Sequence, residues 1–177
     1  MFLITKNKIN ISLCGMMGAG KSVIGKILAK KTDFTFFDTD ILIEKKANKS
    51  INDIFKDHGE KHFRNLEEKI VIETLNKKNS IISLGGGAII NSKIRNMLKK
   101  NSFNIYLKVS IDILENRLNN SKKRPLINKK NLNLTLNELF KKREKFYNRA
   151  DIIIENQMNV KSAVENIITK IGNYEKN

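Results

Sequence analysis

The sequence is short of residues that bind metals or form covalent cross-links: it has one cysteine, Cys14, and two histidines among 177 residues. A single cysteine excludes an internal disulfide and a cysteine-rich metal site. Cys14 ends an apolar strand pattern, so a buried core residue explains it better than a reactive thiol. His58 and His62 have metal-ligand spacing on a helix, but Gly59 interrupts that helix and no third ligand is evident. We therefore expect no zinc site.

Long apolar runs are also missing from the chain. None approaches the roughly 20 residues that cross a bilayer, and the apolar start at 1–5 is too short for the core of a signal peptide. We therefore expect a cytoplasmic protein with no membrane partner. A chain of 177 residues that is 40% hydrophobic and 29% charged is typical of one globular domain, here 1–177.

Acidic residues are scarce, with 18 against 34 basic residues and a formal net charge of +16. Such basicity is typical of nucleic-acid-binding proteins. However, the lysines are scattered along a chain that is also rich in Asn and Ile and has a single proline. This pattern favours a general compositional bias, so we expect no nucleic-acid partner, although the positive field helps to attract anionic small molecules.

Short apolar runs alternate with segments of helical periodicity. Strands are predicted at 9–13, 34–37, 80–84, 103–109 and 151–154, and helices at 21–31, 92–100, 111–119, 134–147 and 160–171. Within 41–75 the helical pattern breaks near Ser50 and Gly59, which favours three successive helices. Continuously apolar strands that alternate with helices predict a parallel sheet covered on both faces. Ligands of such sheets bind beyond the carboxyl ends of the strands.

A glycine-rich loop, Gly15–Ser22, matches the phosphate-loop pattern between the first predicted strand and helix. Its backbone amides and the positive end of the helix would hold phosphates. Lys21 would reach the β and γ phosphates, and the Ser22 hydroxyl would bind Mg²⁺. About one chance match is expected per hundred such sequences, and the placement lowers that rate further. The loop therefore predicts binding of a nucleoside triphosphate.

Asp38 and Asp40 lie one residue apart at the end of the second predicted strand, so we expect their side chains on the same side of the chain. In phosphoryl transfer one carboxylate can hold the water shell of the metal while the other accepts a proton from a hydroxyl group. Alone, the pair has a simpler interpretation, because aspartate commonly caps helices and Asp40 could cap the one that follows. The phosphate loop favours the catalytic interpretation.

Three further features are weak individually. Gly85–Gly87 would let the backbone approach a ligand, or simply form a tight turn. Arg64 could lie on a solvated helix face. Arg117 and Arg124 flank a basic loop that could close over a triphosphate, but arginines are common in so basic a chain.

Together these features resemble the shikimate kinase family over nearly the whole chain, through the order and spacing of short motifs. The matching residues are Gly15–Ser22, Asp38–Asp40, Gly59–Glu60, Phe63–Arg64, Glu67, Gly85–Gly87, Arg124–Leu126, Arg143 and Tyr147. The resemblance implies an α/β three-layer P-loop kinase of the nucleoside-monophosphate-kinase type, with a five-stranded parallel sheet and helices on both faces. It also implies transfer of the γ-phosphoryl of ATP to the 3-hydroxyl of shikimate, in aromatic amino acid biosynthesis.

The resemblance also implies the site residues. For ATP these are Gly18, Ala19, Gly20, Lys21, Ser22, Val23, Arg117 against adenine and Arg124 from a lid. For shikimate they are Asp40, Arg64, Gly86, Gly87 and Arg143, with Phe55 and Phe63 as pocket walls. Mg²⁺ would be bound by Ser22 and, through water, by Asp38. The catalytic residues would be Lys21, Asp40 and Arg124.

The same resemblance implies substrate-binding helices over 41–75, a lid loop over 117–134 and a monomer. The segment 155–160, near the family's adenine contacts, lacks the proline of some members.

Two alternatives remain at this point. Another small-metabolite kinase of this fold, such as a gluconate kinase, would share the loop but does not explain the two arginines, the glycine triplet and Asp40 together. A non-catalytic regulator or nucleic-acid-binding protein with this fold would be expected to lack Lys21, Asp40 or Arg64, which are all present.

Overall fold

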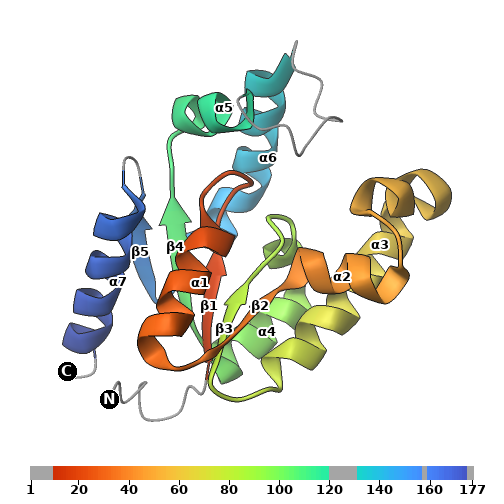
Figure 1. The fold of residues 1–177 in the computed structure, drawn as a ribbon. Coiled ribbons are helices and arrows are strands. Elements are labelled where there is room, and N and C mark those ends of the chain that lie inside the picture. Colours follow the sequence, from red (N-terminus) through yellow and green to blue (C-terminus); the bar gives the residue numbers. More distant parts are fainter. Residues whose placement is uncertain (1–9, 120–130, 157–158, 175–177) are drawn as a thin grey trace.

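The computed structural model describes residues 10–119, 131–156 and 159–174. A five-stranded sheet with the order β2-β3-β1-β4-β5 lies at its centre (Figure 1). All neighbouring strands pair in parallel, which confirms the predicted sheet. The strands are β1 (Asn10–Cys14), β2 (Thr35–Asp38), β3 (Ser80–Ser83), β4 (Ser102–Lys108) and β5 (Ile152–Glu155).

Helices cover both faces of the sheet, and this confirms the three-layer architecture. They are α1 (Lys21–Thr32), α2 (Thr39–Ala47), α3 (Ile51–Leu75), α4 (Ser92–Asn101), α5 (Ile111–Asn119), α6 (Leu132–Tyr147), α7 (Val160–Tyr174) and a short 3₁₀ helix, η1 (Ala88–Ile90). Helix α1 packs beside α7 on one face, and α3 packs beside α4 on the other (Figure 1). Within the described ranges, no helix is both long and apolar enough to cross a membrane.

The strands β1, β3 and β4 form the interior of the core, and their apolar side chains are almost fully buried. Asn10 is buried at the start of β1 because its side chain satisfies three backbone groups. It donates to the carbonyls of Leu75 and Lys77 at 3.1 and 2.7 Å and accepts from the amide of Ser80 at 3.1 Å. Cys14 is 1% exposed, and burial raises its pKa to about 12. It is therefore a neutral core thiol, as predicted.

Helix α2 and the first part of α3 form an arm that stands away from the sheet (Figure 1). The arm packs on a small core separate from that of the sheet, made by Ile43 and Ile54 of the arm and by Phe63 and Ile70 of the second segment of α3. Ser50 caps α3 by accepting a hydrogen bond from the amide of Asp53. Gly59 has φ 76° and ψ 174°, which is not helical and divides α3 into two segments. Both predicted breaks in 41–75 are therefore present.

Helix α1 packs so closely on the sheet that Gly25 has no room for a side chain. A Cβ at Gly25 would lie 2.5 Å from a Phe36 ring atom and 3.2 Å from Leu13 Cδ1, whereas a Cβ at Gly172 in α7 meets nothing within 4 Å.

We therefore predict that Gly25→Ala lowers the free energy of unfolding by about 1 to 3 kcal/mol through overpacking, measured by urea denaturation. The control Gly172→Ala should raise it by up to about 1 kcal/mol, because alanine is the better helix former. Equal effects of the two substitutions would contradict this packing.

Candidate active site

The loop between β1 and α1 is shaped by glycines. A Cβ at Gly15 would lie 2.6 Å from the carbonyl oxygen of Leu107, and Gly15 has φ +138°. Gly20 is the N-cap of α1, with φ 90° and no side-chain capping bond. The first amides of a helix have no partner within the helix, so the start of α1 presents N–H groups and a positive dipole end to an anion. Ala19 is buried in this loop, whereas Val23, one turn on, is 53% exposed.

Lys21 folds back over the loop, and its Nζ donates to the carbonyls of Gly15 and Met16 at 2.9 Å each. Ser22 donates from Oγ to Oδ2 of Asp38 at 2.5 Å. This pair joins the start of α1 to the carboxyl end of β2. A hydroxyl and a carboxylate side by side are oxygen ligands of the kind that Mg²⁺ prefers, directly or through water.

Asp38 and Asp40 are arranged differently from the expected pair on one strand. Asp38 is the last residue of β2 and caps α2, because its Oδ1 accepts from the amides of Asp40 and Ile41 at 3.1 and 3.4 Å. Asp40 lies in the first turn of α2. The alternative that Asp40 caps this helix is therefore wrong, since Asp38 is the cap.

The glycine triplet after β3 lies against the charged residues of the site. A Cβ at Gly85 would lie 2.6 Å from Asp40 Oδ1, and a Cβ at Gly87 would lie 2.6 Å from Arg64 Nη1. At Gly86 a Cβ would lie 3.4 Å from Arg143 Nη1 and 3.5 Å from both the Gly15 oxygen and the Met17 nitrogen. The triplet therefore brings the phosphate loop, Asp40, Arg64 and Arg143 together.

Thr39 fixes the triplet relative to α2, although it was not a predicted site residue. It is fully buried. Its hydroxyl donates to the carbonyl of Ser83 at 3.2 Å and accepts from the amide of Gly85 at 2.9 Å. A threonine between two aspartates at the end of a predicted strand is a sequence signal that could have identified Thr39.

Arg64 and Glu67 form an ion pair beside the triplet, with Nη1 of Arg64 2.7 Å from Oε2 of Glu67. Glu60 adds a second, exposed partner for Arg64 at 3.1 Å. Glu67 is 2% exposed, and burial raises its pKa although Arg64 lowers it. Burial acts to lower the pKa of Arg64, but Glu67 and Glu60 raise it overall. Glu67 thus belongs to the site, and its i, i+3 spacing from Arg64 is the signal for it.

Arg143 approaches the triplet from α6 and is 6% exposed. Its Nη1 contacts the Met16 sulfur at 4.0 Å, and its Nε is buried without a hydrogen-bond partner in the described part of the chain. One turn on, Tyr147 donates to the carbonyl of Gly86 at 2.6 Å. Its ring stacks on Tyr106 with 5.0 Å between centroids. Burial raises the pKa of Tyr147, so it remains a neutral hydrogen-bond donor.

Arg117 at the end of α5 contacts the other side of the phosphate loop. It donates to the carbonyls of Gly18 and Asn156 at 3.2 Å each. Asn156 follows β5, is 2% exposed and donates to the carbonyl of Ala19 at 2.7 Å. Asn156 was not among the predicted site residues, although it lies in the segment 155–160 and a polar residue directly after a parallel strand is a signal for such a site. Arg124 and most of the predicted lid lie outside the described residues.

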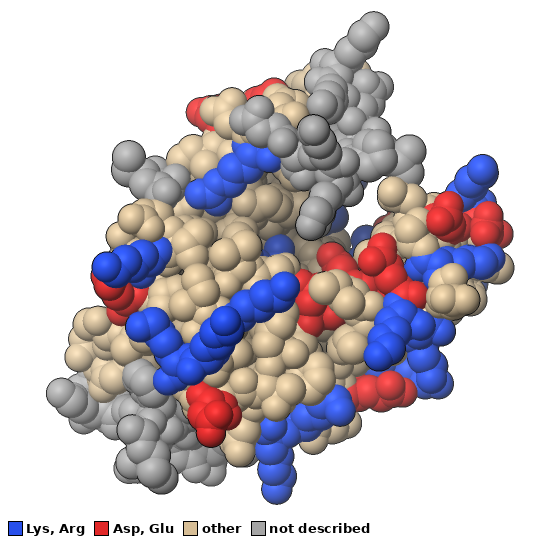
Figure 2. Space-filling view, viewed as in Figure 1, with Lys and Arg blue, Asp and Glu red and all other residues tan. Residues whose placement is uncertain are grey.

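The two residues predicted to wall the substrate pocket differ in their exposure to solvent. Phe63 is 4% exposed and belongs to the core of the arm, while Phe55 stacks on it at 4.6 Å and is 37% exposed. Figure 2 shows a hollow between the main body and the arm, with acidic and basic side chains around it.

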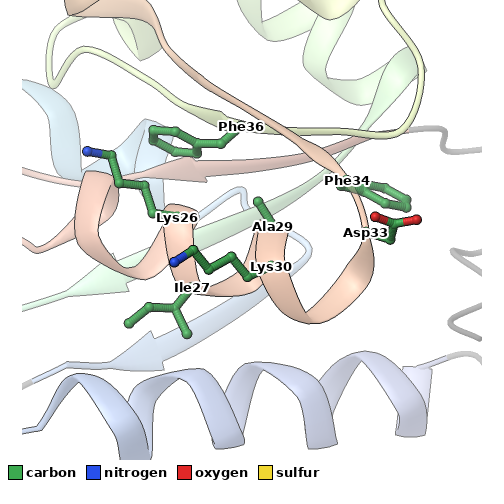
Figure 3. A pocket seen from close by; sticks show the side chains of 7 residues that line it. All are labelled: Lys26, Ile27, Ala29, Lys30, Asp33, Phe34 and Phe36. Carbon is green, nitrogen blue, oxygen red and sulfur yellow. The ribbon is translucent and has the colours of Figure 1, made fainter.

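A second hollow of about 430 Å³ lies on the outer side of α1 (Figure 3). Phe34 and Phe36 line it together with the exposed residues Lys26 and Lys30. The charged side chains around the triplet, Asp40, Arg64, Glu67 and Arg143, do not line this second hollow.

A phosphate loop that meets charged side chains beyond the carboxyl ends of a β2-β3-β1-β4-β5 sheet defines a P-loop kinase of the nucleoside-monophosphate-kinase type. The family model described as shikimate kinase matches residues 17–172. The chain belongs to the shikimate kinase family.

Individual relatives agree with this assignment. Shikimate kinase of Rippkaea orientalis is 45% identical over 163 residues, which cover 92% of this chain and 86% of that protein. The solved structure of shikimate kinase from Acinetobacter baumannii in complex with shikimate is 32% identical, with a TM-score of 0.90 and coverage of 95% of each chain. A gluconokinase structure from Sinorhizobium meliloti is 11% identical with a TM-score of 0.64, covering 97% and 95% of the two chains, so that likeness shows the fold alone.

We predict that Tyr147→Phe lowers the free energy of unfolding by about 0.5 to 1.5 kcal/mol, because the part-buried carbonyl of Gly86 loses its donor. Urea denaturation measures this. The matched control is Tyr174→Phe, at a residue that is 47% exposed, and it should change stability little. If Tyr147→Phe were neutral, the hydroxyl would not stabilise the triplet.

Proposed function

We propose that this chain transfers the γ-phosphoryl group of ATP to the 3-hydroxyl of shikimate, giving ADP and shikimate 3-phosphate. This proposal rests mainly on the position of Gly86, which is adjacent both to the backbone of the phosphate loop and to Arg143. A phosphate held by the loop and an anionic acceptor held by arginine would therefore meet without a large movement. The name of the family and its member solved with shikimate support the choice of acceptor.

On the acceptor side, Arg64 and Arg143 would bind the carboxylate of shikimate. Planar guanidinium groups suit carboxylates because they can donate two parallel hydrogen bonds. The buried Nε of Arg143, which lacks a partner among the described residues, supports an anionic ligand here. The backbone of Gly86 and Gly87 would contact the ring of the acceptor.

On the donor side, Gly18–Ser22 and Val23 would contact the phosphates through the loop and the start of α1. Arg117 would lie against the adenine. The Oδ1 atom of Asn156 is buried and, among the described residues, has no partner, so it offers an acceptor for the amino group of the base. Arg124 would add a cation from the lid.

The Ser22 hydroxyl and the Asp38 carboxylate would hold Mg²⁺, Asp38 through water, and their 2.5 Å contact fits that donor set. A bound Mg²⁺ would supply charge neutralisation at the triphosphate. Described histidine, cysteine and acidic residues form no cluster of three that could hold a metal. This agrees with Mg²⁺ that is bound mainly by the phosphates and water.

The chain would act by positioning and charge stabilisation. Asp40 would orient the 3-hydroxyl and accept its proton as the oxygen attacks the γ-phosphorus. The bond from the γ-phosphorus to the bridging oxygen breaks, and ADP leaves with that oxygen. Lys21 and Arg124 would stabilise the negative charge that develops on the transferred group. We also propose that the chain works as a cytoplasmic monomer.

A coupled ADP-release assay with shikimate and gluconate as alternative acceptors tests the function. We expect ADP release with shikimate only, and Lys21→Met should abolish it because the loop loses its cation. Turnover of gluconate but not shikimate would overturn the proposal. Wild-type rates in Lys21→Met would remove Lys21 from the site.

We predict that Arg64→Ala raises KM for shikimate roughly tenfold to a hundredfold, because charge-assisted hydrogen bonds contribute about 1.5 to 3 kcal/mol each. KM for ATP should change little. Steady-state kinetics with each substrate varied measures both.

The substitution also leaves the buried Glu67 without its closest cation, so Arg64→Ala/Glu67→Gln is the control for misfolding. It should regain stability but not shikimate affinity. A normal KM in the double variant would mean that Arg64 serves only to neutralise Glu67.

A further inference from the structure

A pocket of about 490 Å³ lies between α4, η1 and the C-terminal end of α6. Arg95 and Lys99 line it from α4, and Phe146 and Arg149 line it from the end of α6 and the turn that follows. None of these four residues belongs to the site proposed for ATP or shikimate.

Two guanidinium groups in this pocket share one aromatic ring. Cζ of Arg95 lies 4.2 Å and Cζ of Arg149 lies 5.7 Å from the centroid of Phe146. In the described part of the chain, neither arginine forms an ion pair. Asp151 is the one acidic residue of the lining, and its Oδ2 accepts from the amide of Asn104 at 2.7 Å.

The pocket is therefore positively charged, with Arg95, Lys99 and Arg149 against Asp151. Burial and the charge of Arg149 lower the pKa of Arg95. Like charges held this close repel each other, and an anion between them would offset the repulsion. The charge pattern thus favours an anionic ligand over a neutral or cationic one.

Arg95 is held in place by the backbone. Its Nη1 donates to the carbonyls of Ile89 and Ile90 at 3.0 and 2.5 Å. A guanidinium group carries five N–H donors, so Nε and Nη2 keep donors for a ligand while Nη1 is occupied. A side chain that is already oriented loses less entropy on binding.

We propose that this pocket binds a small oxyanion, a phosphate or a carboxylate group, between Arg95 and Arg149. The ligand would join η1 and α4 to the end of α6. Both walls continue from the active site: Gly87 immediately precedes η1, and Arg143 and Tyr147 lie on α6 beside Phe146. A bound oxyanion would stabilise the arrangement of Gly86, Gly87 and Arg143 and so lower KM for the acceptor. This second step rests on the proposed function.

Backbone amide NMR shifts during a titration with inorganic phosphate test binding without any need for activity. Phosphate is also expected to bind the loop at Gly15–Ser22, but the amides of the two sites give separate signals, so binding at each can be followed. We expect saturable shifts at Ile90, Phe146 and Arg149 that sodium chloride at equal ionic strength does not produce. A parallel titration with acetate shows whether carboxylates bind as well as phosphates. Shifts that chloride reproduces would overturn the site.

The variant Arg95→Gln/Arg149→Gln should weaken phosphate binding at these amides about tenfold or more, because it removes both charge-assisted donors. The matched control is Lys26→Gln/Lys30→Gln, which removes the same charge from the hollow on α1 (Figure 3). That control should leave the shifts at Ile90, Phe146 and Arg149 unchanged. Equal weakening by both variants would show a general charge effect and would overturn the proposal.

Coupling is tested by KM for shikimate at saturating MgATP, with and without phosphate. We expect phosphate to lower this KM in the wild type and to leave it unchanged in Arg95→Gln/Arg149→Gln. NMR binding without a change in KM would overturn the coupling alone. A chain that binds phosphate here but phosphorylates no shikimate would refute the proposed function and leave the site standing.

Discussion

The close approach of charged side chains to a backbone without side chains is the constraint on which this site depends. Asp40 and Arg64 lie so close to Gly85 and Gly87 that a Cβ on either glycine would collide with them, whereas a Cβ at Gly86 would make ordinary contact with Arg143. The same short segment lies beside the phosphate loop at Gly15 and Met17. The proposed donor and acceptor subsites are neighbours because this segment passes between them and has no room for side chains at Gly85 and Gly87.

Glu67 and Arg64 neutralise each other beside the triplet. An unpaired charge away from water is costly, and Glu67 is 2% exposed, so its ion pair with Arg64 stabilises this part of the fold. Arg143 differs, since its buried Nε has no partner among the described residues. In the proposed function, that group is available to bind an anionic acceptor.

Local patterns in the sequence were sufficient for the fold and for the phosphate loop. The strands are short runs rich in apolar residues, and Ser50 and Gly59 mark the breaks in 41–75, so short-range signals determined these elements. The resemblance to the shikimate kinase family implied roles for Arg64 and Arg143, which no local pattern distinguishes from other basic residues on helices.

Contacts between distant residues explain what could not be predicted. Asn156 reaches Ala19 across 137 positions of the chain, and the Tyr147 hydroxyl reaches Gly86 across 61. Such hydrogen bonds depend on how β5 and α6 pack, which periodicity does not encode. The placement of Asp40 was also misjudged, because α2 begins at Thr39, directly after its cap Asp38, and ends the alternation of the strand.

In the proposed function, the geometry around Gly86 directs one phosphoryl group to one hydroxyl of shikimate. Two-dimensional ³¹P–¹H correlation NMR of the product is a direct test. We expect a single phosphate ester whose phosphorus couples to the proton on carbon 3. An ester at another hydroxyl, a mixture of esters, or ADP formed without any shikimate ester would contradict it.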